Sequence, residues 1–235
     1  MNAQSLVRSD VLASMELFQG LSSVALADTM ICARTHELRA ETRIFYQGDG
    51  AARAYALIEG GVRISQSGSD GEQVVIRFVA PGEMFGTVAL FTDRRYPAEA
   101  VTLTQSVALS WGEADMLELM NRYPRIAVNL VGILGRRLQE VQERFREIAT
   151  QSVERRIAHA LLRLAEKAGE NTGQGTEIDF PLTRKHVAEM SGTTLYTVSR
   201  ILTRWEKSGW IVTSNQRVTL CDFTRIIRIA EDGVD

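Results

Sequence analysis

The sequence predicts an α+β protein with an N-terminal antiparallel β domain, a long helix and a C-terminal domain of helices and strands. Between about residues 35 and 111, short apolar runs alternate with glycine-containing turns. An apolar repeat with a mean step of 3.5 residues follows, and two short helical patterns with two trailing strands come last. We place the N-terminal β domain at residues 1–123, the long helix at 124–151 and the C-terminal domain at 152–235.

The composition is that of an average globular protein. The chain has 235 residues, of which 45% are hydrophobic and 24% charged, so it can form one or two domains with a substantial core. No run of about 18 apolar residues exists, and we expect neither a membrane span nor a signal peptide. Cys32 and Cys221 lie far apart and form no ligand pair, so we expect a cytoplasmic location.

The N-terminal domain opens with a helical pattern and continues with strands. Apolar residues recur at three- and four-residue steps from Val11 to Leu21. Residues 54–66, 72–79 and 98–111 are typical of strands, and turn signals about every 10–13 residues favour a compact antiparallel barrel or sandwich.

The 3.5-residue repeat predicts a coiled-coil seam on one long helix. Pro124 suits the first helical turn, and the helix from there to Ile148 would be about 37 Å long. A narrow, long stripe of this kind favours homodimerisation, and the alternative is a helix packed on its own domain. The seam residues are Ala127, Val131, Leu134, Leu138, Val141, Phe145 and Ile148.

The C-terminal domain contains a helix–turn–helix followed by a wing. Ser152 is expected to begin a helix that ends at Gly169, followed by a polar loop over 170–177 and a short strand over 178–183. Thr183 would cap a helix over 184–190, Gly192 would form the turn, and Thr194 would cap a helix over 194–208. Residues 210–221 are typical of two strands around a tight turn.

The second of these helices is amphipathic. We expect Val198, Ile201, Leu202 and Trp205 on its buried stripe and Leu195, Tyr196, Ser199, Arg200 and Thr203 on its open face. Residues 1–150 carry a net charge of −3, whereas residues 182–217 hold six basic residues against two acidic ones, a net +4. A basic segment on an acidic protein can attract a polyanion locally.

A winged helix-turn-helix with this charge predicts binding to double-stranded DNA. Arg200 is long enough for a bidentate bond to guanine, and Arg184 at a helix start suits a phosphate. The residues expected to contact DNA are Arg184, Thr193, Thr194, Tyr196, Thr197, Ser199, Arg200, Lys207 and Arg217. The alternatives are a packed helical hairpin in an enzyme or adaptor, and a ligand-binding module without DNA activity. No catalytic motif is present, so we do not expect an enzyme.

Four sequence blocks resemble the cyclic-AMP receptor protein / fumarate–nitrate reduction regulator (CRP/FNR) family of bacterial transcription factors. They are PGEMFGTVALF, GRRLQEVQ, VERRIAHALLRLAE and LTRKHVAEMSGTT with TVSRIL. The resemblance implies a cyclic-nucleotide-binding-domain-like β-roll, a dimerisation helix and a winged helix-turn-helix. It also implies a homodimer on an inverted-repeat promoter site, RNA polymerase as a partner, and an effector whose binding reorients the DNA-binding domains through a hinge at 149–152.

The resemblance places an effector pocket in the β-roll, at Gly86, Thr87, Val88, Tyr96, Pro97, Ala98, Val141 and Gln142. Thr87 stands where cyclic-nucleotide-binding relatives have a glutamate for the ribose, and Tyr96-Pro97 stands where they have Arg-Ser for the phosphate. Proline has no N–H to offer, and a buried phosphate without a cation is poorly compensated. We therefore do not expect cyclic AMP to be the effector.

Other signals stay open at this point. Cys32 and Cys221 are too few for the iron–sulfur cluster of the oxygen-sensing branch. Cys32 or His36 could ligate a haem, and Cys32 could act as a redox switch if its pKa were lowered. Tyr196 replaces the acid with which many family members read a cytosine amine, so the operator is expected to differ at that base pair.

Overall fold

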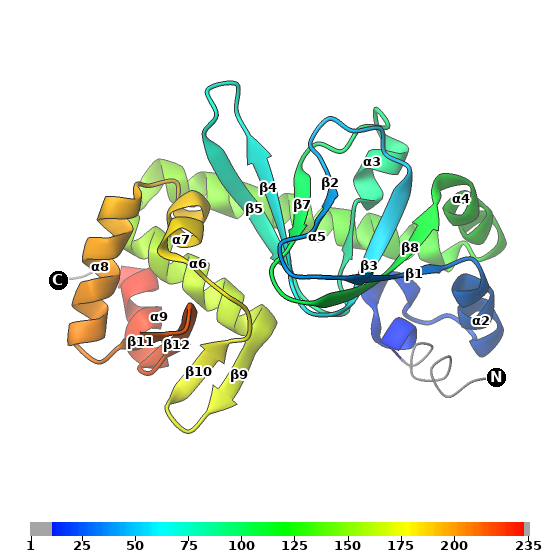
Figure 1. Cartoon of the computed structure of the whole chain (residues 1–235). Coiled ribbons are helices and arrows are strands. Elements are labelled where there is room, and N and C mark those ends of the chain that lie inside the picture. The colour runs from blue at the N-terminus through cyan, green and yellow to red at the C-terminus, as the bar shows by residue number, and fades with distance from the viewer. Residues whose placement is uncertain (1–10, 233–235) are drawn as a thin grey trace. The chain divides into compact units, whose positions relative to one another are not determined.

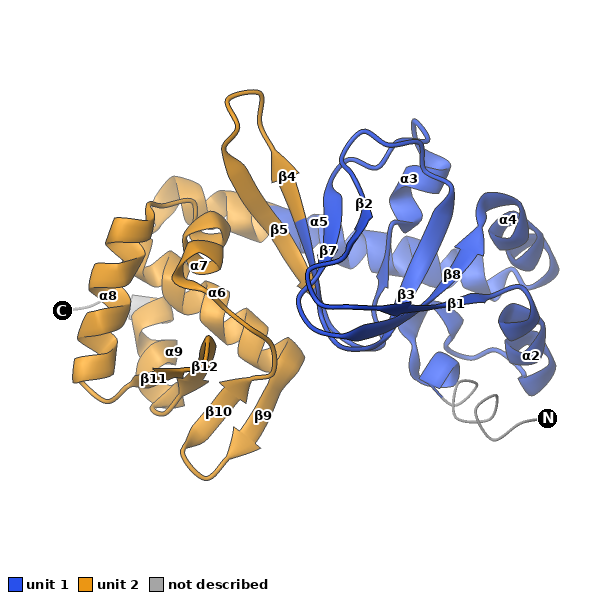
Figure 2. Ribbon diagram, viewed as in Figure 1, with its two compact units in different colours: residues 1–64, 79–141 blue, residues 65–78, 142–235 orange. Residues whose placement is uncertain are grey.

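The computed structural model describes residues 11–232 and divides into two units, residues 1–64 with 79–141 and residues 65–78 with 142–235 (Figure 2). An antiparallel β domain, a long helix and a C-terminal helix-turn-helix confirm the predicted fold class. The division cuts the long helix between Val141 and Gln142, whereas we predicted the whole helix as a separate part. The predicted domain boundaries therefore stay a prediction.

The β-roll consists of two four-stranded antiparallel sheets (Figure 1). The predicted strand regions at 54–66, 72–79 and 98–111 each contain the strands expected there. The first sheet has the order β1 (Arg34–Leu38), β8 (Ser106–Gly112), β3 (Arg53–Glu59) and β6 (Met84–Phe85). The second has the order β2 (Arg43–Phe45), β7 (Glu99–Thr102), β4 (Val62–Ser67) and β5 (Gln73–Val79).

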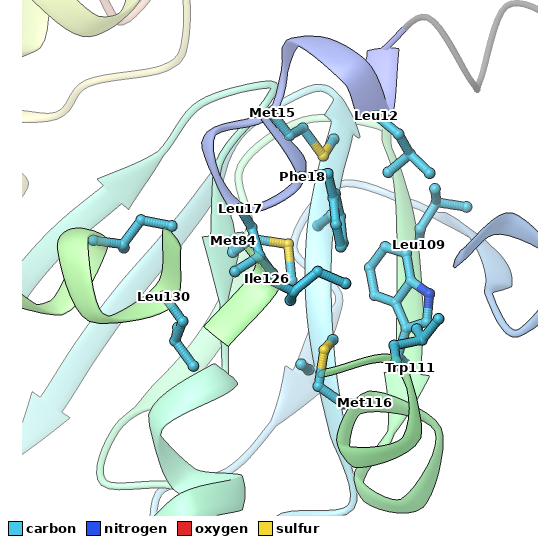
Figure 3. Close-up of a cluster of buried hydrophobic side chains, with 14 of the residues drawn as sticks. Leu12, Met15, Leu17, Phe18, Met84, Leu109, Trp111, Met116, Ile126 and Leu130 are labelled. Carbon is cyan, nitrogen blue, oxygen red and sulfur yellow. The ribbon is translucent and has the colours of Figure 1, made fainter. Parts of the chain in front are cut away.

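Short helices close the core of the first unit. They are η1 (Glu16–Phe18), α2 (Ser23–Ile31), α3 (Thr87–Phe91) and α4 (Glu113–Arg122). The helical pattern from Val11 to Leu21 is only partly a helix, since one turn over residues 11–14 gives way to η1. Its buried members nevertheless line the core, where the Phe18 ring lies 5.4 Å from Trp111 (Figure 3). The Trp111 indole donates to the Thr29 carbonyl at 2.8 Å, so its polar atom is satisfied.

The long helix α5 (Arg125–Thr150) begins at Arg125, one residue later than the predicted start at Pro124. Ile126, Leu130 and Ile133 lie on one face and are buried in the core of the first unit. The 26 residues give a length of about 39 Å at 1.5 Å per residue. The helix therefore has one apolar face inside its own domain, in addition to the seam predicted from the sequence.

Up to residue 232, the second unit holds four helices besides the end of α5, namely α6 (Val153–Ala168), α7 (Arg184–Ser191), α8 (Leu195–Lys207) and α9 (Phe223–Asp232). Its sheet has the order β11 (Ile211–Ser214), β12 (Arg217–Leu220), β10 (Gly175–Ile178) and β9 (Gly169–Thr172). Strands β11 and β12 form the predicted wing. Asn215 and Gln216 at its tip both have positive φ, 50° and 61°, as a two-residue type I′ hairpin turn requires.

The predicted polar loop over 170–177 is wrong, because these residues form the β9–β10 hairpin. The short strand predicted over 178–183 is also wrong, since β10 ends at Ile178. All four residues of β9 are exposed, so the strand has no buried face and no apolar alternation that the sequence could display. The Thr172 hydroxyl donates to the Gly175 carbonyl at 2.9 Å and closes the turn.

Candidate nucleic-acid interface and sensor site

Local capping interactions fix the geometry of the α7–turn–α8 motif. The Thr183 hydroxyl accepts from the His186 N–H at 3.1 Å, and His186 Nδ1 accepts from the Thr183 N–H at 3.3 Å. Gly192 has φ 60° and ψ 50°, the left-handed conformation that ends α7. The Thr194 hydroxyl accepts from the Thr197 N–H at 3.2 Å and caps α8. These caps confirm the predicted starts of both helices.

Arg156 on α6 supports the turn of this motif and was not predicted as a site residue. Its guanidinium donates to the carbonyls of Ser191 at 2.8 Å, Gly192 at 3.2 Å and Gln151 at 3.0 Å. Carbonyls at the end of α7 carry partial negative charge, so a cation there is stabilising. The sequence gives no signal for this contact, because Arg156 precedes the turn by 35 residues.

The open face of α8 carries the side chains that could meet a ligand. Val198, Ile201, Leu202 and Trp205 are buried as predicted, while Tyr196 is 77% exposed and Arg200 is also exposed. A shallow hollow of about 500 Å³ runs along this face. It is lined by Tyr196, Ser199, Arg200, Thr203, Arg204 and Lys207. Of the remaining predicted DNA contacts, Thr193 and Thr197 are half-buried at the start of α8.

Several basic side chains near this face are paired within the protein. Arg184 donates to Glu206 Oε1 at 3.2 Å and Oε2 at 3.0 Å, and to the Thr203 hydroxyl at 3.1 Å. This contact joins the start of α7 to the end of α8, a role that the sequence did not suggest. The predicted phosphate contact of Arg184 is untested and stays a prediction.

Arg217 and Arg204 are also paired. On the wing, Arg217 donates to Asp179 at 2.5 Å and lies 3.4 Å from Glu177, and its hydrogen bond to Asp179 raises the pKa of Arg217. Arg204 forms an ion pair with Glu154. By contrast, the side chains of Arg200 and Lys207 have no hydrogen bond or ion pair among residues 11–232, so both cations are available to an anionic or acceptor-rich partner.

The predicted dimer seam lies on the surface of α5. Six of its seven residues are exposed large hydrophobic side chains, including Val131 at 70% and Phe145 at 74% exposure. The seventh, Ala127, is half-buried. Single exposed hydrophobic residues are normal on proteins, but a continuous stripe of this length marks a surface that another molecule covers.

An aromatic cluster occupies the predicted effector site. The Tyr96 ring is buried and stacks on Phe45 with centroids 3.8 Å apart, and Phe45 also lies close to Tyr55 and Phe85. The Tyr96 hydroxyl donates to the Arg53 carbonyl at 2.7 Å and accepts from the Arg53 N–H at 3.1 Å. Tyr96 therefore fills, with its aromatic ring, the position where the resemblance to cyclic-nucleotide-binding relatives would place an arginine.

The two arginines just before Tyr96 in the chain are engaged elsewhere. Arg94 pairs with Glu113 at 2.8 Å, and Arg95 donates to the Gly48 carbonyl at 2.8 Å. The other predicted pocket residues are spread between core and surface. Gly86, with φ 71°, precedes α3, Thr87 and Ala98 are buried, and Val88, Pro97, Val141 and Gln142 are exposed. None of the eight predicted pocket residues carries a basic side chain that could pair with a phosphate.

His36 and Cys32 have environments that bear on a haem or redox role. Ser110 Oγ accepts from Arg53 Nε at 2.7 Å, so its proton can be donated to His36 Nε2, which lies 2.6 Å away. Burial and the Arg53 and Arg34 charges lower the pKa of His36. Burial, followed by Asp115, Glu118 and Asp28, raises the pKa of the Cys32 thiol, opposite to the shift that activates a redox cysteine.

Residues 11–232 contain neither a metal-binding cluster nor a membrane-spanning helix. No group of three or more His, Cys, Asp or Glu side chains there is placed to hold a metal ion. No helix in that range has the length and apolar character to cross a membrane.

Comparison with known proteins agrees with this architecture. Residues 35–123 match the family Cyclic nucleotide-binding domain, and residues 155–229 match the family Crp-like helix-turn-helix domain. The Cyclic AMP receptor protein of Thermus thermophilus is 31% identical over 166 residues, which are 71% of this chain and 74% of that protein. The CRP-like cAMP-activated global transcriptional regulator of Mycobacterium tuberculosis is 26% identical over 221 residues, which are 94% of this chain and 99% of that protein. A solved CRP/FNR-family regulator from Thermus thermophilus has a TM-score of 0.71 at 26% identity, covering 86% of this chain and 100% of its own.

The fold, the capped helix-turn-helix and these similarities define a DNA-binding transcription regulator with an N-terminal domain of the cyclic-nucleotide-binding type. The chain belongs to the CRP/FNR family, whose members are transcription regulators and not enzymes. The resemblance inferred from the four sequence blocks is thereby confirmed.

Proposed function

We propose that the protein is a homodimeric regulator that binds an inverted-repeat promoter site through α8 in the major groove. The observation that carries this proposal is Arg200, an exposed arginine without an intramolecular partner among the described residues, on the open face of α8. Only side chains near the start of a recognition helix reach base edges, and arginine binds guanine O6 and N7 with two hydrogen bonds.

A second copy of the chain supplies the symmetry of the proposed operator. Pairing of the exposed α5 seams would place two copies of α8 about a two-fold axis, so each half-site would occupy one of two successive major grooves about 34 Å apart. Residues Tyr196, Ser199 and Arg200 are assigned to base edges, and Thr193, Thr194, Thr197 and Lys207 to positioning on the backbone. Arg184 and Arg217 would reach phosphates only after release from their carboxylate partners.

The experiment that tests this proposal is selection of a binding site from random duplexes, followed by measurement of affinity. Arg200→Ala should cost about 1–3 kcal/mol at one base pair and relax specificity there. Arg228→Ala is the matched control, because Arg228 is an exposed arginine on α9, outside the helix-turn-helix. If Arg200→Ala keeps the same ratio of cognate to scrambled affinity, the base-reading role is wrong. If no sequence is enriched at all, the protein is the alternative, a ligand-binding module without DNA activity.

The effector is proposed to be something other than cyclic AMP, although the two relatives described above carry cyclic AMP in their names. The buried Tyr96 and its stack on Phe45 support this, because they fill the phosphate position without offering a positive charge. A ligand at a hundredfold excess over its Kd stabilises the folded state by about 2.7 kcal/mol. Cyclic AMP at millimolar concentration should produce no such shift in thermal unfolding.

A haem-dependent gas sensor of the same family is the second candidate, with His36 or Cys32 as the ligand. The hydrogen bond between His36 Nε2 and Ser110 disfavours it, because that nitrogen is then not free to bind iron. An absorption spectrum of the purified protein distinguishes a haem-dependent sensor from a regulator with another effector, since a Soret band would establish haem. By family resemblance we also assign RNA polymerase as a partner and the cytoplasm as the location, which pull-down and fractionation can test.

A further inference from the structure

The first turn of α8 exposes two neighbouring non-polar or aromatic side chains. Leu195 is 51% exposed and Tyr196 is 77% exposed, whereas the other large apolar side chains of the helix are at most 5% exposed. Neither contributes the cap, which Thr194 supplies. An exposed leucine at this position therefore serves no evident purpose in the fold of the motif.

Helical geometry places Tyr196 on the same open surface as Arg200, because the two residues are four positions apart. Leu195 lies about 140° around the helix from Arg200 and does not line the hollow. It is four positions before Ser199, at the edge of that surface. Ser199 and Thr203, which also line the hollow, have small side chains and allow close approach of a partner. The surface thus combines an apolar tip with the unpaired cations Arg200 and Lys207, which attract a polyanion.

The major groove of DNA offers one apolar group on its base edges, the C5-methyl of thymine. Adenine, guanine and cytosine present donors and acceptors that a leucine cannot satisfy, and covering them without a hydrogen bond is unfavourable. Resting on the DNA-binding function proposed above, we propose that Leu195 and Tyr196 read thymine methyl groups beside the base pair contacted by Arg200. The operator half-site then combines one guanine with one or two adjacent thymines.

Replacing thymine by deoxyuridine tests this proposal, because the substitution removes the methyl group and leaves all hydrogen-bonding atoms. Each thymine of the selected operator is replaced in turn, symmetrically in both half-sites, and Kd is measured by fluorescence anisotropy at constant salt. Loss of one methyl contact should weaken binding about fourfold per half-site, as expected for one buried methyl-sized group. Replacing cytosine by 5-methylcytosine at the same position in a weaker site should restore binding by a similar factor.

Protein variants identify which side chain makes the contact. The Leu195→Ala protein should bind the operator with equal affinity whether thymine or deoxyuridine stands at the position that Leu195 contacts. The Tyr196→Ala protein should show the same loss of preference at the neighbouring position. Tyr196→Phe should keep the methyl preference, since it retains the ring, and Arg200→Ala should keep the deoxyuridine penalty while losing the guanine preference. Circular dichroism of each variant checks that the helical content is unchanged.

The possible failures are distinguishable. If a specific operator is selected but deoxyuridine is tolerated at every position, the methyl-reading inference is overturned and the DNA-binding proposal stands. If Leu195→Ala retains the full deoxyuridine penalty at every thymine, Leu195 does not contribute and that half of the inference is wrong. If no operator is selected, the proposed function itself fails.

Discussion

The Arg184 guanidinium binds both carboxylate oxygens of Glu206, at 3.2 and 3.0 Å, and so joins the two helices of the DNA-binding motif. The side chains are only 33% and 26% exposed, which reduces solvent screening of the pair. Arg184, which the sequence pattern assigns to phosphate binding, thus holds α8 against α7 in this structure. Its carboxylate partner also lowers the positive charge of the motif.

Glu206→Gln should separate these two roles of Arg184. We expect a loss of about 0.5–1 kcal/mol in the free energy of unfolding, because the pair is partly exposed. We also expect tighter non-specific DNA binding, since the freed arginine can contact a phosphate, with a slope of log K against log salt steeper by about 0.9 per half-site. Glu170→Gln, an exposed glutamate on β9, removes the same charge elsewhere. Equal slopes for the two variants would argue against a phosphate contact by Arg184.

Val131→Glu should convert the proposed homodimer to monomers without unfolding the chain. The substitution would place two like charges in the seam, and each uncompensated buried charge costs about 3–5 kcal/mol. Val24→Glu on α2 is the matched control, because Val24 is similarly exposed, at 65%, and lies outside α5. Sedimentation equilibrium measures the change. A Val131→Glu protein that still sediments as a dimer would show that the seam is not the interface.

Tyr96→Phe should destabilise the β-roll by about 1 kcal/mol or more in urea unfolding, because the partly buried Arg53 carbonyl and N–H lose their shared partner. The exposed Tyr196 provides the control, since Tyr196→Phe should change the unfolding free energy by less than about 0.5 kcal/mol. A neutral result for Tyr96→Phe would mean that water or another donor replaces the hydroxyl.

His36 should make the stability of the protein fall in mild acid. Its pKa is lowered in the folded state by burial and by Arg53 and Arg34, so the unfolded chain binds a proton more readily. The stabilising contribution is present above the ordinary histidine pKa of about 6.5 and is lost as the pH falls below it. Urea unfolding between pH 5 and 8 should show this decline, and His36→Gln should flatten it. A decline of the same steepness in the variant would assign it to other groups.

Much of the fold could be predicted because its signals are local. Ser152, Thr183 and Thr194 each cap a helix through a residue three positions later, and the spacing of Val198, Ile201 and Trp205 fixes the buried face of α8. The β9–β10 hairpin escaped prediction since its strands carry polar side chains at a sheet edge.

The missing parts of the candidate site depend on contacts between distant residues. Charge counts identified a basic segment, but they could not distinguish Arg200, which has no described partner, from Arg184, which faces Glu206. Similarly, the sequence shows that Tyr96 stands where cyclic-nucleotide-binding relatives have an arginine. It does not show that the Tyr96 ring stacks on Phe45, which lies on a strand about fifty residues earlier.

Helix α5 carries an inward apolar face at Ile126, Leu130 and Ile133, and the predicted seam begins beside it at Ala127 and continues to Ile148. One residue inserted after Ile133 would turn the seam from Leu134 onward by about 100° relative to the inward face. Seven inserted residues would come within about 20° of restoring the alignment and would lengthen the rod by about 10.5 Å. The chain can therefore change the length of this helix without losing either face only by insertions close to a whole number of helical turns, as a heptad is.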